Sequence, residues 1–279
     1  MTRPGPSLFD APGPLGRRRI RIATAAATVL GLALLGLALR QFAVNGQLDR
    51  DKWAPYGTMV MWRYLLTGLL NTVFAAAVTL LLSCLFGILL ALACLSKHAA
   101  VRVPARCFLE VFRVLPPVLL ILFALFVLPR YGLDLPLLWK LVVPLTANRS
   151  AQLAVVFRAG IAGLDPGQRE AAAALGMRQA GTMVHVVLPQ ALRNVLPSLV
   201  SQTVGIVKDT SLGLFVSYLE LLKSAQVLAA FNHLLIQSYL VVALVYLLVN
   251  YSLSRLARWL DARRSPGISG NREKKYQSR

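Results

Sequence analysis

Three polar side chains interrupt a mainly apolar run near the middle of the sequence. Asn148, Arg149 and Gln152 lie within residues 136–157. Asn148 and Gln152 are four residues apart, so on a helix they share one face. An arginine can hold a carboxylate through two parallel N–H···O bonds. Arg149 is therefore a candidate for contact with an anionic ligand. A structural pair with an acid such as Asp209 is the alternative.

Two more pairs of charges lie in or beside apolar runs. Lys208 and Asp209 are adjacent, so they occupy different faces of a helix. Glu110 and Arg113 are three residues apart, and this spacing predicts an ion pair along one helix. Charged residues inside a membrane segment are costly and often functional, which makes all of these positions candidates for transport chemistry or helix packing.

The chain lacks the motifs of the common catalytic sites. It contains no G-x-x-x-x-G-K-[ST] phosphate loop, and its three histidines form no serine–histidine–aspartate pattern. Its three cysteines (Cys84, Cys94 and Cys107) lack metal-ligand spacing. We therefore expect no catalytic residue, no bound metal and no cofactor in this chain.

Long apolar runs must position the polar residues. The chain is 57% hydrophobic and 15% charged, whereas soluble domains carry about 25% charged residues. A bilayer core requires about 20 apolar residues per helix. This pattern predicts an all-α membrane protein, a polytopic bundle of about six transmembrane helices. They are expected near residues 20–42, 64–95, 107–129, 136–157, 195–217 and 234–253. The alternative for the first helix is a cleavable signal peptide.

The distribution of basic residues predicts the orientation. If both termini are cytoplasmic, the inner segments hold 20 Lys and Arg residues and the outer segments hold seven, as the positive-inside rule requires. The net charge of +19 then reflects topology, and we expect no nucleic-acid partner. Residues 1–19 and 258–279 are predicted to be disordered basic tails. The C-terminal tail could also contact anionic membrane lipid.

The longest cytoplasmic loop, at residues 158–194, has strong helix signals. Asp165 is a candidate N-cap and is followed by Pro166 at the first helical turn. An alanine-rich run follows, and Gly176 is expected to end this helix. A second short helix is predicted to begin near Gln179. Two short helices with small side chains form a compact projection that could dock into another protein. The alternative is an interfacial helix that lies on the membrane, although its alanine face offers little apolar area to bury there.

This loop resembles the EAA loop of ABC importer permeases. The matching residues are Glu170-Ala171-Ala172, Gly176 and Leu188-Pro189, with Val186 in place of the usual isoleucine. Further segments resemble the polar amino acid (His/Glu/Gln/Arg) branch of that family, and the extra N-terminal helix is similar to glutamate-type permeases. These segments are Asn71-Thr72, Glu110-Val111-Phe112-Arg113, Phe157-Arg158-Ala159-Gly160-Ile161 and Lys208-Asp209-Thr210-Ser211-Leu212.

The resemblance implies an importer subunit whose ATP is bound and hydrolysed by a separate cytoplasmic ATPase dimer. The further partners would be a second permease subunit, identical or homologous, an extracytoplasmic substrate-binding protein and an amino acid, with glutamate as the first expectation. The implied ATPase-coupling residues are Glu170, Ala171, Ala172, Gly176, Leu188 and Pro189. The implied substrate-pathway residues are Asn148, Arg149, Gln152, Lys208, Asp209, Thr210 and Ser211.

The chain departs from the family at one place that bears on the substrate. The family commonly has N-S-x-x-Y-x-x-E before its F-R-G-G-I segment, where this sequence has Arg149, Gln152 and Val155 at the Ser, Tyr and Glu positions. The change removes an acid and adds a guanidinium, which favours an anionic ligand.

The resemblance also sets the expected domain limits. Residues 20–63 are expected to form the additional helix and an outer loop, and residues 64–257 the permease domain. The rival class is a secondary transporter driven by an ion gradient. That class predicts inverted repeats and coupling-ion carboxylates at the membrane midplane, and the sequence shows neither clearly.

Overall fold

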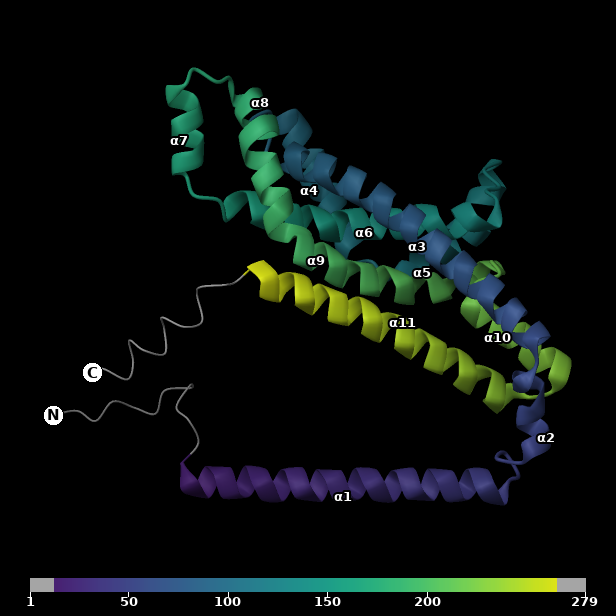
Figure 1. Cartoon of the computed structure of the whole chain (residues 1–279). Coiled ribbons are helices and arrows are strands. Elements are labelled where there is room, and N and C mark those ends of the chain that lie inside the picture. The colour runs from purple at the N-terminus through teal and green to yellow at the C-terminus, as the bar shows by residue number, and fades with distance from the viewer. Residues whose placement is uncertain (1–12, 265–279) are drawn as a thin grey trace. The chain divides into compact units, whose positions relative to one another are not determined.

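The computed structural model describes the backbone of residues 13–264 and the side chains up to residue 259. All regular elements within this range are helical. The chain divides into two units, Met1–Thr58 and Met59–Arg279, which are described separately (Figure 1).

The first unit is built on one long apolar helix. Helix α1 (Pro14–Val44) is followed by α2 (Arg50–Trp53) and the short helix η1 (Ala54–Gly57). The basic residues just after Pro14 already belong to α1, so the expected tail at residues 1–19 is too long. Residues 1–12 lie outside the described residues. Helix α1 buries none of its residues.

The second unit is a bundle of long helices with short helices between them. Its elements are α3 (Met59–Cys94), α4 (Ala99–Val114), α5 (Pro117–Phe126), η2 (Leu128–Tyr131), α6 (Leu137–Ala162), α7 (Gly167–Ala174), α8 (Gln179–Thr182), η3 (Met183–Val187), α9 (Leu188–Asp209), η4 (Thr210–Val216), α10 (Leu221–Asn232) and α11 (Leu235–Arg264). Helix α11 extends into the expected tail at residues 258–279, of which residues 265–279 lie outside the described residues.

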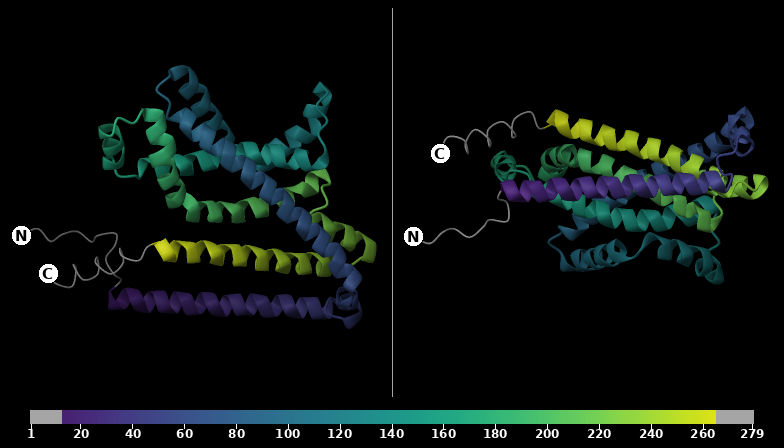
Figure 2. Two further views of the ribbon diagram at one scale, coloured as in Figure 1. Left: turned by 45° about the horizontal axis from the view of Figure 1, so that its top comes forward. Right: turned by 90° about the horizontal axis from the view of Figure 1, so that it is seen from below.

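Helices α3 and α6 form the centre of this bundle. They cross at close range, as Figure 2 shows. A Cβ atom at Gly87 of α3 would lie 3.0 Å from the Leu153 Cβ and 3.2 Å from the Ser150 carbonyl oxygen. Small residues allow membrane helices to approach this closely. Side chains from α4 and α9, including Leu109 and Val195, complete the buried cluster around this crossing.

The chain turns sharply where two prolines follow α4. Leu115 and Pro116 are both extended, with ψ angles of 129° and 131°. Extended backbone is favoured before a proline, and Pro116 and Pro117 cannot donate helical hydrogen bonds. Helices α4 and α5 are therefore bent by 99° relative to each other. The span expected at residues 107–129 is therefore divided into two helices at Pro116 and Pro117.

The described residues hold three helices that are long and apolar enough to cross a membrane, namely α1, α3 and α11. The number rises to five if each of two bent pairs counts as one span. One pair is α4 with α5, and the other is the segment Gln179–Val216 with α10, which is bent by 46°. Helix α6 has 26 residues and is about 39 Å long at 1.5 Å per residue. This length would cross a bilayer core of about 30 Å, so the described helices agree with five or six spans.

Candidate functional site

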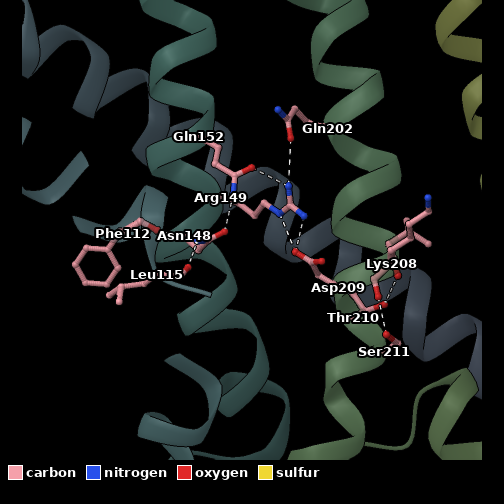
Figure 3. Close-up of polar contacts among 11 residues, drawn as sticks. Phe112, Leu115, Asn148, Arg149, Gln152, Gln202, Lys208, Asp209, Thr210 and Ser211 are labelled. Carbon is pink, nitrogen blue, oxygen red and sulfur yellow. Dashed lines mark hydrogen bonds and ion pairs between the residues drawn. The ribbon is translucent and has the colours of Figure 1, made fainter. Parts of the chain in front are cut away.

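The polar stripe of α6 meets α9 through an ion pair. The Nε and Nη2 atoms of Arg149 donate to Asp209 Oδ2 at 3.0 and 2.5 Å. The Arg149 side chain is 11% exposed and that of Asp209 is 21% exposed. Figure 3 shows the guanidinium between the two helices. The two expected site residues therefore neutralise each other's charge.

Gln202 and Gly205 of α9 also help to hold this guanidinium, together with Gln152 of α6. The sequence analysis did not identify Gln202 or Gly205. Gln202 Oε1 accepts a hydrogen bond from Arg149 Nη1 at 3.2 Å, and Gln152 Oε1 accepts another at 3.0 Å. A Cβ atom at Gly205 would lie 3.0 Å from Arg149 Nη2. The missing side chain at Gly205 thus leaves space for the guanidinium against the α9 backbone. Neither role has a local sequence signal.

Asn148 lies beside Arg149 and is engaged with α4. Its Nδ2 donates to the carbonyl oxygens of Phe112 and Leu115 at 2.7 and 3.0 Å, and its Oδ1 accepts from Gln152 Nε2 at 2.8 Å (Figure 3). The Phe112 carbonyl has no helical partner because the residue four positions later is a proline. Asn148 therefore satisfies backbone groups at the 99° bend.

The remaining expected pathway residues lie apart from the ion pair. Lys208 is exposed and extends from the opposite side of α9 (Figure 3). Thr210 is buried and donates to the Val207 carbonyl oxygen at 2.7 Å. Ser211 donates to the Lys208 carbonyl oxygen, also at 2.7 Å. The structure therefore brings Asn148, Arg149, Gln152 and Asp209 together but separates Lys208 and Ser211 from them.

A second buried polar network centres on Glu220, which the sequence analysis did not single out. Its side chain is fully buried and caps α10 by accepting from the backbone N–H groups of Leu222 and Lys223 at 2.8 and 2.6 Å. Tyr246 of α11 donates its hydroxyl hydrogen to the same carboxylate at 2.7 Å. The only feature of the sequence that could have indicated this network is the position of Glu220, an acidic residue within an apolar stretch just before α10.

The Glu110–Arg113 ion pair is confirmed. Arg113 Nη2 lies 2.6 Å from Glu110 Oε2 in the last turns of α4. Both side chains are substantially exposed, so the pair contributes at most about 1 kcal/mol.

The loop between α6 and α9 has the predicted helix and turn. Gly176 has a φ angle of +72°, the left-handed conformation that favours glycine. The N–H of Gly176 donates to the Ala173 carbonyl oxygen at 2.9 Å, and that of Met177 to the Ala172 carbonyl oxygen at 3.1 Å. These two bonds form a Schellman motif. The prediction that Gly176 ends the helix is confirmed.

The start of this helix also follows the sequence signals. Asp165 Oδ1 accepts from the Gly167 N–H at 2.8 Å, and α7 begins at Gly167. The second short helix begins at Gln179 as predicted. It continues through the π-helical segment η3 into α9, which has Pro189 in its first turn.

The expected coupling residues lie on both surfaces of this projection. Ala172 of α7 is buried and Leu188 of α9 is partly buried. The exposed surface carries Glu170, Ala171, Gly176 and Pro189. Leu175, which was not among the expected residues, is 83% exposed at the end of α7.

Comparisons with known proteins agree with these features. Residues 83–266 match the family model described as "Binding-protein-dependent transport system inner membrane component". The chain is 35% identical over 221 residues to the glutamate transport system permease protein GluD of Corynebacterium glutamicum, covering 78% of this chain and 81% of that protein. It is 30% identical over 209 residues to the glutamate/aspartate import permease protein GltK of Escherichia coli, covering 72% and 93%.

A solved structure has the same fold. It is the crystal structure of an amino acid ABC transporter with histidines, which matches with a TM-score of 0.69 and 27% identity over 77% of this chain and 99% of that chain. The chain therefore belongs to the family of binding-protein-dependent transport system inner membrane components, and it is a membrane-embedded permease subunit of an ABC transporter rather than an enzyme.

Proposed function

We propose that this chain is the permease subunit of an ATP-driven importer of a polar amino acid, with glutamate as the expected substrate. The observation that carries the ATP-driven part is the α7 projection, which ends in the Gly176 turn and exposes Leu175. The names of GluD and GltK support an acidic amino acid as the substrate class.

The projection is tied to the helices that would have to move. Arg169 Nη2 donates to the Ile161 carbonyl oxygen of α6 at 3.1 Å, and Gln190 Nε2 of α9 donates to Gln168 Oε1 at 3.1 Å. A force applied to α7 therefore reaches both α6 and α9. The Arg149–Asp209 pair connects the same two helices deeper in the bundle, so we expect them to move as one body.

The partners follow from this assignment. A cytoplasmic ATPase dimer would bind ATP and engage the projection through Glu170, Ala171, Ala172, Gly176, Leu188 and Pro189. A second permease subunit and an extracytoplasmic binding protein would complete the importer. Both termini would be cytoplasmic in the cell membrane, because 20 of the 27 Lys and Arg residues outside the spans would then lie inside.

Uptake by the reconstituted complex tests this function. The permease would be assembled in proteoliposomes with its cognate ATPase and binding protein and supplied with radiolabelled L-glutamate. We expect uptake that requires ATP and the binding protein. Uptake that proceeds without ATP and follows an imposed ion gradient would contradict the proposal.

Gly176 provides the matched variants for the coupling part. Gly176→Asn should retain most activity, since asparagine tolerates a φ angle of +72°. Gly176→Trp should lose at least 90% of uptake and of ATPase co-purification, because it distorts the turn and adds bulk where the partner would approach. Its membrane insertion should be unchanged, because Gly176 lies in the loop at residues 158–194, outside the expected spans. Normal uptake by the Trp variant would refute the docking argument.

A further inference from the structure

A groove lined by both apolar and polar side chains lies between the end of α9 and the length of α11. It has a volume of about 740 Å³, and its lining includes Lys208, Ser211, Tyr246, Asn250 and Ser254. No carboxylate is present among the described residues that line it. Lys208 and Arg258 therefore make the groove positively charged, and its α11 wall carries hydroxyl and amide groups among apolar side chains.

The groove lies at a depth where polar groups need a polar neighbour. Tyr246 is 11 residues beyond Leu235, or about 17 Å along the helix, near the middle of the apolar span Leu235–Trp259. A lysine that faces lipid at the centre of a bilayer costs about 2.5–3.5 kcal/mol or more. Lys208 lines the same groove as Tyr246, which indicates that water, a solute or protein fills this groove.

A second groove on the same unit provides the contrast. It lies between α3, α4 and α6, and its lining is almost wholly apolar, including Phe86, Leu89, Phe108 and Trp139. Such a surface is compatible with lipid chains. The polarity of the α9–α11 groove is thus a property of that surface and not of the whole bundle.

Lys208 is available to a ligand, whereas Arg149 is not. Arg149 is neutralised by Asp209. Lys208 is exposed and has no carboxylate partner among the described side chains. Asn250 adds an unsatisfied acceptor: its Nδ2 donates to the Tyr246 carbonyl oxygen at 2.8 Å, but its buried Oδ1 has no donor among the described residues. A buried acceptor without a donor costs about 1–3 kcal/mol.

We propose that the α9–α11 groove binds the transported amino acid, with Lys208 contacting its carboxylate and the Asn250 amide oxygen accepting from its ammonium group. This inference rests on the proposed function and identifies the cation that recognises the substrate. The two groups offer opposite ends to a zwitterion, and the lack of an acidic lining residue favours an amino acid with a second carboxylate.

Substrate protection of an engineered cysteine tests the groove. In the full complex in nanodiscs, lacking the three native cysteines, Ala243→Cys would place a thiol in the groove lining. Leu244→Cys is the matched control, since Leu244 is exposed but lies outside the lining. The reagent is a trimethylammonium methanethiosulfonate, and the probe is L-glutamate at saturating concentration. We expect Ala243→Cys to react and L-glutamate to slow its reaction at least fivefold, while Leu244→Cys stays unreactive.

Lys208→Met should abolish this protection, and Lys208→Arg should retain part of it. Lys223→Met is the control for loss of a positive charge, because Lys223 donates to Gln226 Oε1 and does not line the groove. Protection that survives in Lys208→Met would overturn the proposal. Labelling of Ala243→Cys that L-glutamate does not slow would also overturn it. An unreactive Ala243→Cys would indicate that lipid fills the groove. Disulfide-linked dimers that L-glutamate does not prevent would indicate a contact between two permease subunits, and either result would overturn the proposal. Wild-type uptake separates the two failures: without ATP-driven glutamate uptake the proposed function fails, and with uptake but no protection only the groove assignment fails.

Discussion

Removal of one member of the Arg149–Asp209 pair should destabilise the assembled permease more than replacement of both. The pair has two N–H···O bonds, at 3.0 and 2.5 Å, and both side chains are mostly buried. Loss of one partner of a buried pair costs about 3–5 kcal/mol. Because some solvent still reaches this pair, we expect about 3 kcal/mol for Arg149→Met, which leaves the Asp209 carboxylate without a cation.

The reverse change should cost less. Asp209→Leu leaves the guanidinium hydrogen-bonded to the amide oxygens of Gln152 and Gln202. Each hydrogen bond to a charged group is worth about 1.5–3 kcal/mol, so these two bonds offset part of the loss. We therefore expect a loss of stability of about 2 kcal/mol. The double variant Arg149→Met/Asp209→Leu removes both charges and should cost only about 1 kcal/mol in total, because an apolar pair often replaces an ion pair without loss and only the contacts of the guanidinium with Gln152 and Gln202 are lost. The predicted coupling free energy is about 4 kcal/mol.

Thermal unfolding of the purified complex would measure these differences, together with the abundance of each variant in membranes. A loss of 3 kcal/mol corresponds to a fall of about 6–12 °C in the midpoint for a chain of this size. Additive effects, with a coupling below about 0.5 kcal/mol, would refute the structural pair. Normal stability of Arg149→Ala with impaired glutamate uptake, partly restored in Arg149→Lys, would assign Arg149 to the ligand. Normal abundance and normal uptake would exclude both roles.

Three other predictions concern different parts of the fold. Glu220→Ala should lower the free energy of unfolding by about 2–3 kcal/mol, since it removes a helix cap and the carboxylate that accepts from the Tyr246 hydroxyl. Thermal unfolding measures this loss, and Tyr246→Phe should cost less because both backbone bonds to Glu220 remain. Asn148→Asp should destabilise more than Asn148→Ala, because it directs a carboxylate at two carbonyl oxygens; equal midpoints would contradict this. In a background without native cysteines, an impermeant thiol reagent added outside intact cells should label Gln47→Cys but not Gln179→Cys, and the reverse pattern would invert the topology.

The local features of the fold could be predicted from the sequence. The apolar runs identified the long helices, because a membrane helix satisfies its own backbone hydrogen bonds and needs only length and apolarity. The Gly176 turn was predictable because a left-handed residue at a helix end favours glycine. Residues 107–129 could be identified as one span from their apolarity, but the angle of 99° between its two halves was not predictable, because it depends on how α4 and α5 pack against the rest of the bundle.

The partners of the polar residues were decided only by the tertiary structure. Arg149 and Asp209 are 60 positions apart, and their contact depends on the packing of α6 against α9 and on the missing side chain at Gly205. The sequence placed Asn148 with the candidate ligand residues, but the bend before α5 supplies the carbonyl groups that engage its amide. Lys208 and Asp209 are adjacent in the sequence, but they lie on different faces of α9. Asp209 is therefore paired with Arg149, whereas Lys208 is exposed. Residue type and spacing determine which groups a helix presents, whereas the packing of helices distant in sequence determines which groups become neutralised and which stay available.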